Sequence, residues 1–200
     1  MIKFRMLAAA VAAAGALAAG AAVAVPATPA SASTACGYWR WPVKTGSDAD
    51  RWKVSTTVHY TSVGYLDGLN RPSADLSSSY YHNHRAKWPE FRTWQVKATL
   101  VAVKEESDGD YHLRLHEYGH NMIAEIPRPA CVPSWSRWKD QIRAARSWVN
   151  SRFSVSSYSW DYIYRTIKVR GLGFFDEEHG VTGAAPNQIE LHPVIMIRYP

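Results

Sequence analysis

The chain contains little cysteine, with two cysteines in 200 residues. No C-x-x-C pair occurs, which excludes the ligand spacing of common structural zinc sites. No internal repeat is visible either. In an exported chain, an even number of cysteines predicts a disulfide. Here it would join Cys36 to Cys131 and tie the N-terminal region to the middle of the fold.

Acidic side chains are the minority, at 17 against 23 Lys and Arg. Without Lys3 and Arg5, which belong to the N-terminal segment, 21 basic side chains remain and the net charge is +4. This mild excess is compatible with nucleic acid, another polyanion or a cell-wall partner, but it does not require one.

The N-terminal segment has the pattern of a secretory signal peptide. Lys3 and Arg5 precede a long stretch of Ala, Val and Gly, and an A-x-A site lies at 30–32. The alternative is a membrane anchor, which the helix-breaking Pro26 disfavours. We therefore expect a signal peptide over 1–32, cleavage near Ala32, and a secreted monomer without a stable membrane span. About 168 residues remain, enough for one domain.

The mature chain divides into two regions. Residues 33–90 show no sustained period of 3.6 or 2.0, and we expect an irregular N-terminal arm there. Residues 91–200 show alternating apolar residues and turn dipeptides such as Asp108-Gly109, which predict strands and hairpins. Apolar residues three and four positions apart predict a helix from about Pro133 to Val149.

The predicted elements follow the order β-β-β-α-β-β. The expected strands are 94–102, 110–115, 122–126, 162–170 and 189–197. This is the order of a small OB-like five-stranded barrel, whose helix lies between the third and fourth strands. Pro193 falls inside the last strand, which places that strand at an edge or a bulge.

One motif competes with this prediction. His116, Glu117 and His120 form H-E-x-x-H, which on a helix would supply two zinc ligands and the general base of a metallopeptidase. However, the segment follows an Asp-Gly turn and ends at Pro127, and the usual third ligand is missing. These features favour a hairpin, with His120 in its turn.

Three further motifs resemble a widespread, uncharacterised family of secreted bacterial proteins. They are D-x-H-L at 110–113, M-I-x-E-I-P-x-P-x-C at 122–131, and G-x-G-F-F-D at 171–176 followed by H-G-x-T-G-x-A-P-N-x-I-E-L-H-P-V. The resemblance covers most of 44–194. It implies that the segment between the first two motifs is a variable hairpin loop. No activity is established for that family, so the resemblance supports the fold and not a function.

Two pairs of polar residues are the candidate site. Asp110 and His112 lie two apart on one predicted strand, and Glu190 and His192 two apart on another, so each pair shares a face. If both faces turn to the same side, the four converge as a catalytic site. They would hold a divalent metal ion of unknown identity or act as an acid/base pair. The alternative is solvent-facing polar positions on half-buried strands.

Other residues could extend this site. Asp176 and His179, beside glycines, would join it or cap a turn. We expect Lys44, Arg114 and Arg170 to bind substrate by contacting phosphate.

Three functions therefore stay open at this stage. The first is a metal-assisted hydrolase of phosphodiester type that uses Asp110, His112, Glu190 and His192. The second is a non-catalytic extracellular module that binds nucleic acid, glycan or protein. The third is the zinc peptidase.

Overall fold

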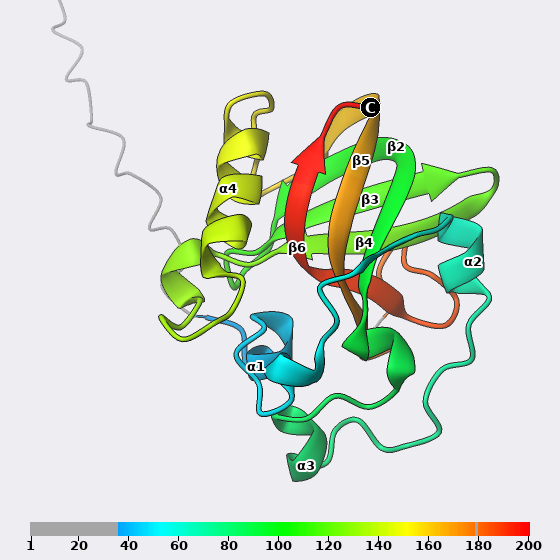
Figure 1. Cartoon of the computed structure of the whole chain (residues 1–200). Coiled ribbons are helices and arrows are strands. Elements are labelled where there is room, and N and C mark those ends of the chain that lie inside the picture. Colours follow the sequence, from blue (N-terminus) through cyan, green and yellow to red (C-terminus); the bar gives the residue numbers. More distant parts are fainter. Residues whose placement is uncertain (1–35, 179) are drawn as a thin grey trace, which may run out of the picture. The chain divides into compact units, whose positions relative to one another are not determined.

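The computed structural model describes residues 36–178 and 180–200 (Figure 1). The expected signal peptide over 1–32 and the expected role of His179 both lie outside the described residues. Within the described ranges, no helix combines the length and the apolar character needed to cross a membrane.

The described part of the chain is mainly β, as the sequence predicts. It forms a six-stranded sheet in the order β1-β2-β3-β4-β6-β5, and β5 pairs with β2 as well. The pairings therefore run in a cycle from β2 through β3, β4, β6 and β5 back to β2. The strands are β1 (Val58–Tyr60), β2 (Thr93–Glu105), β3 (Tyr111–Glu117), β4 (His120–Ile126), β5 (Asp161–Phe175) and β6 (Ile189–Arg198).

Most helices are short. They are α1 (Trp41–Lys44), α2 (Val63–Asp67), α3 (Ser79–His82), the 3-10 turns Arg51–Lys53, Trp88–Phe91 and Pro129–Cys131, and α4 (Lys139–Asn150). Helix α4 is the long one, and its expected start at Pro133 is wrong. Ser136 donates its hydroxyl to the Thr45 carbonyl at 2.6 Å and accepts the Trp138 amide. This tertiary contact holds the preceding segment as a turn.

The segment with the H-E-x-x-H motif is a hairpin, as predicted. Strands β3 and β4 pair with Glu117 opposite His120, which leaves a two-residue loop. Both loop residues, Tyr118 and Gly119, have positive φ. Two positive φ values define the type I′ turn that matches the twist of paired strands. The turn is shorter than expected, because His120 already belongs to β4.

The apolar core is enclosed by the curled sheet, by α4 and by buried residues of the N-terminal region, among them Val63 and Leu66 of α2. Trp94, Val96, Ala98 and Leu100 alternate along β2 and are buried. Helix α4 contributes its apolar stripe of Ile142, Ala145 and Val149. Packing of these two apolar faces is the main stabilising term of the fold.

Strand β6 carries the bulge that its proline predicts. The register between β5 and β6 shifts on both sides of Gly171, opposite the segment that contains Pro193. A proline has no amide hydrogen for the ladder, so an irregular register accommodates it.

The N-terminal arm (residues 36–90) packs against the long strands. Three residues of the arm form β1, which the sequence does not indicate and which pairs in parallel with β2. A disulfide joins Cys36 to Cys131, as predicted. Buried Arg40 forms a two-pronged ion pair with buried Glu90 at 2.7 and 2.8 Å. The disulfide therefore ties the start of the arm to the rest of the fold, and the ion pair ties the two ends of the arm to each other.

Candidate metal centre and its cleft

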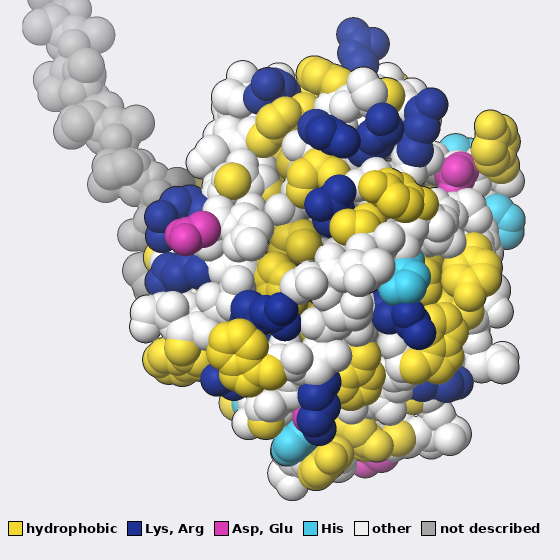
Figure 2. Space-filling model, viewed as in Figure 1, with side chains coloured by type: hydrophobic (Ala, Val, Ile, Leu, Met, Phe, Trp, Pro, Cys, Tyr) yellow, Lys and Arg dark blue, Asp and Glu magenta, His cyan; other side chains and the backbone are white. Residues whose placement is uncertain are grey.

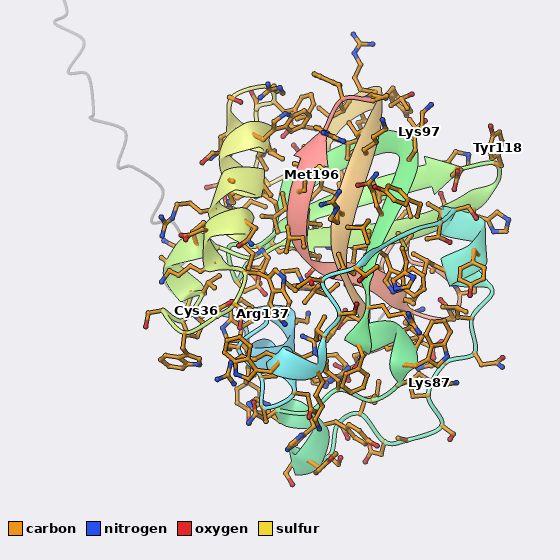
Figure 3. The ribbon with its side chains drawn as sticks, viewed as in Figure 1. Cys36, Lys87, Lys97, Tyr118, Arg137 and Met196 are labelled. Atoms are coloured by element: carbon orange, nitrogen blue, oxygen red, sulfur yellow. A yellow bond between two sulfur atoms is a disulfide. The ribbon has the colours of Figure 1, made fainter. Side chains whose placement is uncertain are left out.

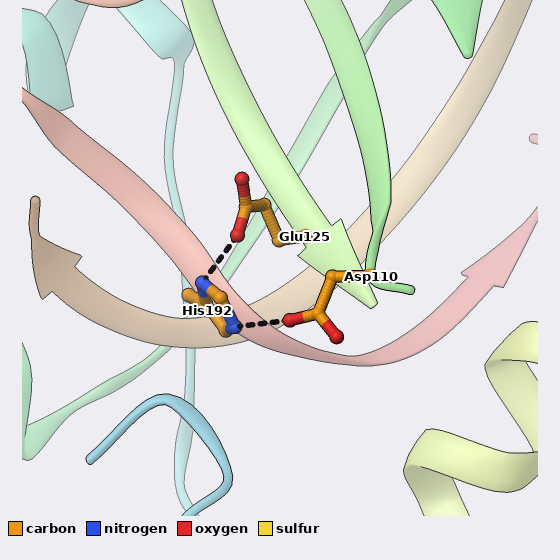
Figure 4. A group of neighbouring side chains, drawn as sticks. All are labelled: Asp110, Glu125 and His192. Atoms are coloured by element: carbon orange, nitrogen blue, oxygen red, sulfur yellow. Dashed lines mark ion pairs between the residues drawn. The ribbon is translucent and has the colours of Figure 1, made fainter. Parts of the chain in front are cut away.

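Three buried side chains converge at the start of β3, near the end of β4 and within β6 (Figure 4). His192 Nδ1 lies 2.9 Å from Glu125 Oε2, and His192 Nε2 lies 3.5 Å from Asp110 Oδ2. One potential ligand atom from each residue falls within 4.8 Å of the other two. Two carboxylates and an imidazole in this arrangement could hold a metal ion.

Strand pairing explains the convergence. In the β3–β4 hairpin, His112 lies directly opposite Glu125. Strand β6 then pairs in parallel with β4, with Glu190 beside Ile123. Side chains alternate between the two faces of a strand, and the neighbours Leu113, Ala124 and Leu191 face the core. The polar residues therefore share the opposite face.

All four predicted site residues are brought together here. His112 Nδ1 lies 3.0 Å from Glu125 Oε1, and Glu190 Oε2 lies 3.9 Å from His192 Nδ1. The alternative of solvent-facing positions is wrong, because Asp110, His112, Glu190 and His192 are all buried.

Sequence reasoning missed Glu125, which contacts both histidines of the site. A signal for it was present. The register of the predicted hairpin places Glu125 opposite His112. The carboxylate of Glu125 must then lie on the same face of the sheet as the His112 ring.

Lys44, from the N-terminal arm, reaches the same group. Its Nζ lies 3.4 Å from Asp176 Oδ1 and 3.9 Å from Glu125 Oε2. Lys44 and Asp176 therefore lie beside Glu125.

Of the two predicted substrate-binding arginines, one lies at the margin of the site and the other lies elsewhere. Arg114 stacks on Trp160 at 5.3 Å, at the margin of the site. Arg170 instead donates to Gln95 on β2 at 2.8 Å, and it does not line the cleft that opens beside the group.

Two effects shift the pKa values of the group: burial of its side chains and the charges of neighbouring residues. Burial opposes the charge of His192, yet Glu125, Asp110 and Glu190 together hold its pKa well above the ordinary value. Burial also favours neutral Glu125, but Lys44 and His192 hold its pKa well below the ordinary value.

The remaining carboxyls respond to the same two causes. Burial, followed by Asp176 and Glu125, raises the pKa of Glu190 to about 7. Burial likewise raises the pKa of Asp110. Carboxylates packed this closely repel one another, and the nearby positive charges do not offset all of this repulsion. A bound cation would reduce it.

Several buried atoms of the group lack a hydrogen-bond partner among the described residues. They are Asp110 Oδ2, Glu190 Oε2, His112 Nε2, and both ring nitrogens of His192. The close approaches around His192 thus lack hydrogen-bond geometry, although charges of opposite sign lie near. Buried polar atoms without partners are costly, and they are rare unless a ligand completes them. The donor set therefore fits a metal ion on geometry and on chemistry.

A cleft of about 610 Å³ opens beside the group. Its lining includes the polar side chains of His112, Glu125 and Asp176 and the aromatic rings of Trp39 and Trp160. The other lining residues are Lys44, Lys104, Glu106, Ser107, Asp108, Glu177, Val181 and Thr182. The buried group is therefore accessible to a small molecule through Glu125 and His112.

The residues of the H-E-x-x-H motif do not form a zinc site. His116 Nδ1 lies 3.1 Å from Asn121 Oδ1, whereas His120 Nδ1 lies 2.8 Å from Asp67 Oδ2. Glu117 accepts the Val63 amide. The helix that would place the two histidines on one face is absent.

Comparisons with known proteins do not assign a family. No family model matches the chain, and no curated protein matches it. A solved structure of a putative aspartyl-tRNA synthetase from Leishmania major Friedlin is similar over 72% of this chain and 21% of that chain, at 12% identity. Its TM-score is 0.39, which is too low to support an argument about fold or function.

Proposed function

We propose that this chain is an exported, metal-assisted hydrolase of phosphodiesters, built on an OB-like five-stranded barrel. The cycle of pairings among β2, β3, β4, β6 and β5, with α4 between β4 and β5, supports the barrel. The disulfide supports export, since such bonds persist in oxidising compartments. The observation that carries the proposal is the buried group of Asp110, Glu125 and His192, with its unpartnered atoms beside an open cleft.

Asp110, Glu125 and His192 would hold the cation. Mixed oxygen and nitrogen donors suit Mn²⁺ and Zn²⁺ better than Ca²⁺, which prefers oxygen alone. When bound, such an ion supplies an activated water at neutral pH and offsets phosphate charge. His112, at 3.0 Å from Glu125, would fix the orientation of that carboxylate.

The cleft assigns roles to further residues. Lys44 keeps its charge, because Glu125 and Asp176 raise its pKa although burial opposes this. Its ammonium group is placed to contact a phosphate oxygen. Trp39 and Trp160 offer apolar walls for a base or another flat group.

The charge of the cleft makes a prediction specific to this function. Its lining carries five carboxylates (Glu106, Asp108, Glu125, Asp176 and Glu177) against Lys44 and Lys104. A phosphodiester is repelled by this lining unless a cation offsets it. Chelation should therefore weaken binding of substrate in the cleft as well as stop its turnover.

The test is hydrolysis by the mature chain supplied in turn with Mn²⁺, Zn²⁺ and Mg²⁺. Bis(p-nitrophenyl) phosphate and single-stranded DNA are the substrates. Glu125→Gln should abolish turnover, whereas Glu117→Gln, on the outer hairpin, should not change it. Equal rates for Glu125→Gln and wild type would rule out the proposal.

A non-catalytic binding module is the second candidate, because of where the cleft lies. Its lining includes Glu106–Asp108, from the loop between β2 and β3, and Asp176, Glu177, Val181 and Thr182, from the loop between β5 and β6. OB folds bind oligonucleotides and oligosaccharides with the corresponding loops. This candidate predicts a ligand that binds in the cleft and is recovered intact after prolonged incubation with each metal.

The zinc peptidase is not proposed, because His116 and His120 lie in a hairpin.

A further inference from the structure

A row of like charges crosses three adjacent strands on the outside of the sheet. Lys97 on β2 lies directly opposite Lys168 on β5, and Lys168 lies directly opposite Arg198 on β6. Neighbouring strands are about 4.8 Å apart. Like charges directly opposite one another destabilise a sheet. The row therefore lowers the stability of the fold, and side-chain packing does not explain why the row is present.

Within the described part of the chain, the positions that flank this row on its three strands carry no acidic side chain. The outward-facing positions beside it are Gln95, Thr99, Thr166, Arg170 and Met196, none of which is acidic. In the described part of the chain, no ion pair includes Lys97, Lys168 or Arg198. Lys97 and Arg198 are exposed.

The surface view agrees with this arrangement. Figure 2 shows Lys and Arg side chains gathered over the region where β2, β5 and β6 lie in Figure 1. In Figure 3, Lys97 is labelled on β2 and Met196 on β6. We call the set Lys97, Lys168, Arg170 and Arg198 the basic face.

Strand β5 connects the basic face to the cleft. Trp160, which lines the cleft, comes immediately before this strand. Tyr162 and Tyr164 follow on the strand, both about 60% exposed, with parallel rings 6.0 Å apart. From Trp160 to Arg170 the chain spans at most about 33 Å. Aromatic rings and cations thus follow one another along a single strand that starts at the cleft.

We propose that the basic face and the two tyrosines bind single-stranded nucleic acid and direct it toward the cleft. Exposed aromatic rings beside cations are the usual means of binding single strands, through base stacking and phosphate contacts. The identity of the partner rests on the proposed phosphodiesterase function, since a nucleic acid is then the substrate. The positive charge of the surface by itself indicates a polyanionic partner but does not distinguish a nucleic acid from other polyanions.

The probe is a fluorescently labelled oligothymidylate of about ten nucleotides, within the length that one OB-type domain covers. Binding is followed by fluorescence anisotropy in EDTA, so that neither turnover nor a metal contributes. The variant is Lys97→Glu/Lys168→Glu/Arg198→Glu. The matched control is Lys87→Glu/Lys139→Glu/Arg143→Glu, which changes net charge equally on other surfaces. Figure 3 shows Lys87 well away from Lys97.

Reversal of the row should weaken binding at least about tenfold, and the control should stay within about twofold of wild type. A plot of the logarithm of the association constant against the logarithm of the salt concentration has a negative slope. The loss of three phosphate contacts should make that slope shallower by about 2, at about 0.7 per contact. A Lys97→Gln/Lys168→Gln/Arg198→Gln variant, which adds no new repulsion, should show the same slope change. Tyr162→Ala/Tyr164→Ala should weaken binding at least about fivefold without changing the slope.

Three outcomes would overturn the proposal. Wild type could fail to bind the oligonucleotide at low salt, or the row variants could bind as wild type does. The protein could also bind phosphatidylglycerol vesicles or a heparin fragment through the row while the tyrosine variant binds the oligonucleotide unchanged. Failure of the proposed catalysis is distinguishable, because it would leave oligonucleotide binding in EDTA intact.

Discussion

The ion pair between Arg40 and Glu90 makes the most quantitative prediction. Both side chains are buried, and Arg40 uses its whole guanidinium. It donates twice to Glu90 and once each to the carbonyls of Tyr81, His84 and Phe175. Arg40→Met should keep most of the packing volume but remove all five bonds.

The expected loss is large, because it strands a buried carboxylate. Breaking a buried ion pair on one side costs about 3–5 kcal/mol. Glu90 would keep only the amides of Ala86 and Phe175 as partners. For a domain of this size, each kcal/mol corresponds to about 2–4 °C in Tm, so we expect a drop of about 6–20 °C.

Urea and thermal unfolding, followed by near-ultraviolet circular dichroism, measure this loss. Arg143→Met is the matched control, because its ion pair with Asp140 is exposed and should contribute less than about 1 kcal/mol. Adding Glu90→Gln to Arg40→Met should recover part of the loss, since the stranded charge is removed. A loss below about 1 kcal/mol for Arg40→Met would refute the reasoning.

Three further predictions follow from other contacts. Cys36→Ser/Cys131→Ser should lower the free energy of unfolding by up to about 4–5 kcal/mol, because the bond closes a loop across 95 residues; urea titration measures this. Gly173→Ala should lower Tm, since its new methyl group would collide with the Pro89 carbonyl, whereas an unchanged Tm would mean that this segment can move. Lys44→Gln should tighten Mn²⁺ binding in calorimetry by removing a cation near the ligands, and should slow phosphodiester turnover.

The local parts of the fold could be predicted from the sequence. Period-two patterns and the Asp108-Gly109 turn correctly indicated the strands, and tertiary context did not override them. The start of α4 was wrong because Ser136 is held by Thr45, which is 91 residues away in sequence. Strand β1 was missed because three residues carry no period.

The candidate site could be predicted only in part for the same reason. The spacing of Asp110 with His112, and of Glu190 with His192, correctly gave two residues per face. That the faces meet depends on the parallel pairing of β4 with β6, which no local pattern encodes. Lys44 arrives from the N-terminal arm, and its position depends on the disulfide and on Arg40.

The central claim is that Asp110, Glu125 and His192 bind a divalent cation. The most direct measurement is metal content by mass spectrometry, with calorimetric titration of Mn²⁺ and Zn²⁺ into chelator-treated mature protein. We predict one ion per chain in wild type and in His116→Ala/His120→Ala. Asp110→Asn/Glu125→Gln should bind at least about tenfold more weakly. Equal binding by wild type and Asp110→Asn/Glu125→Gln, or metal lost only with His116 and His120, would contradict the account.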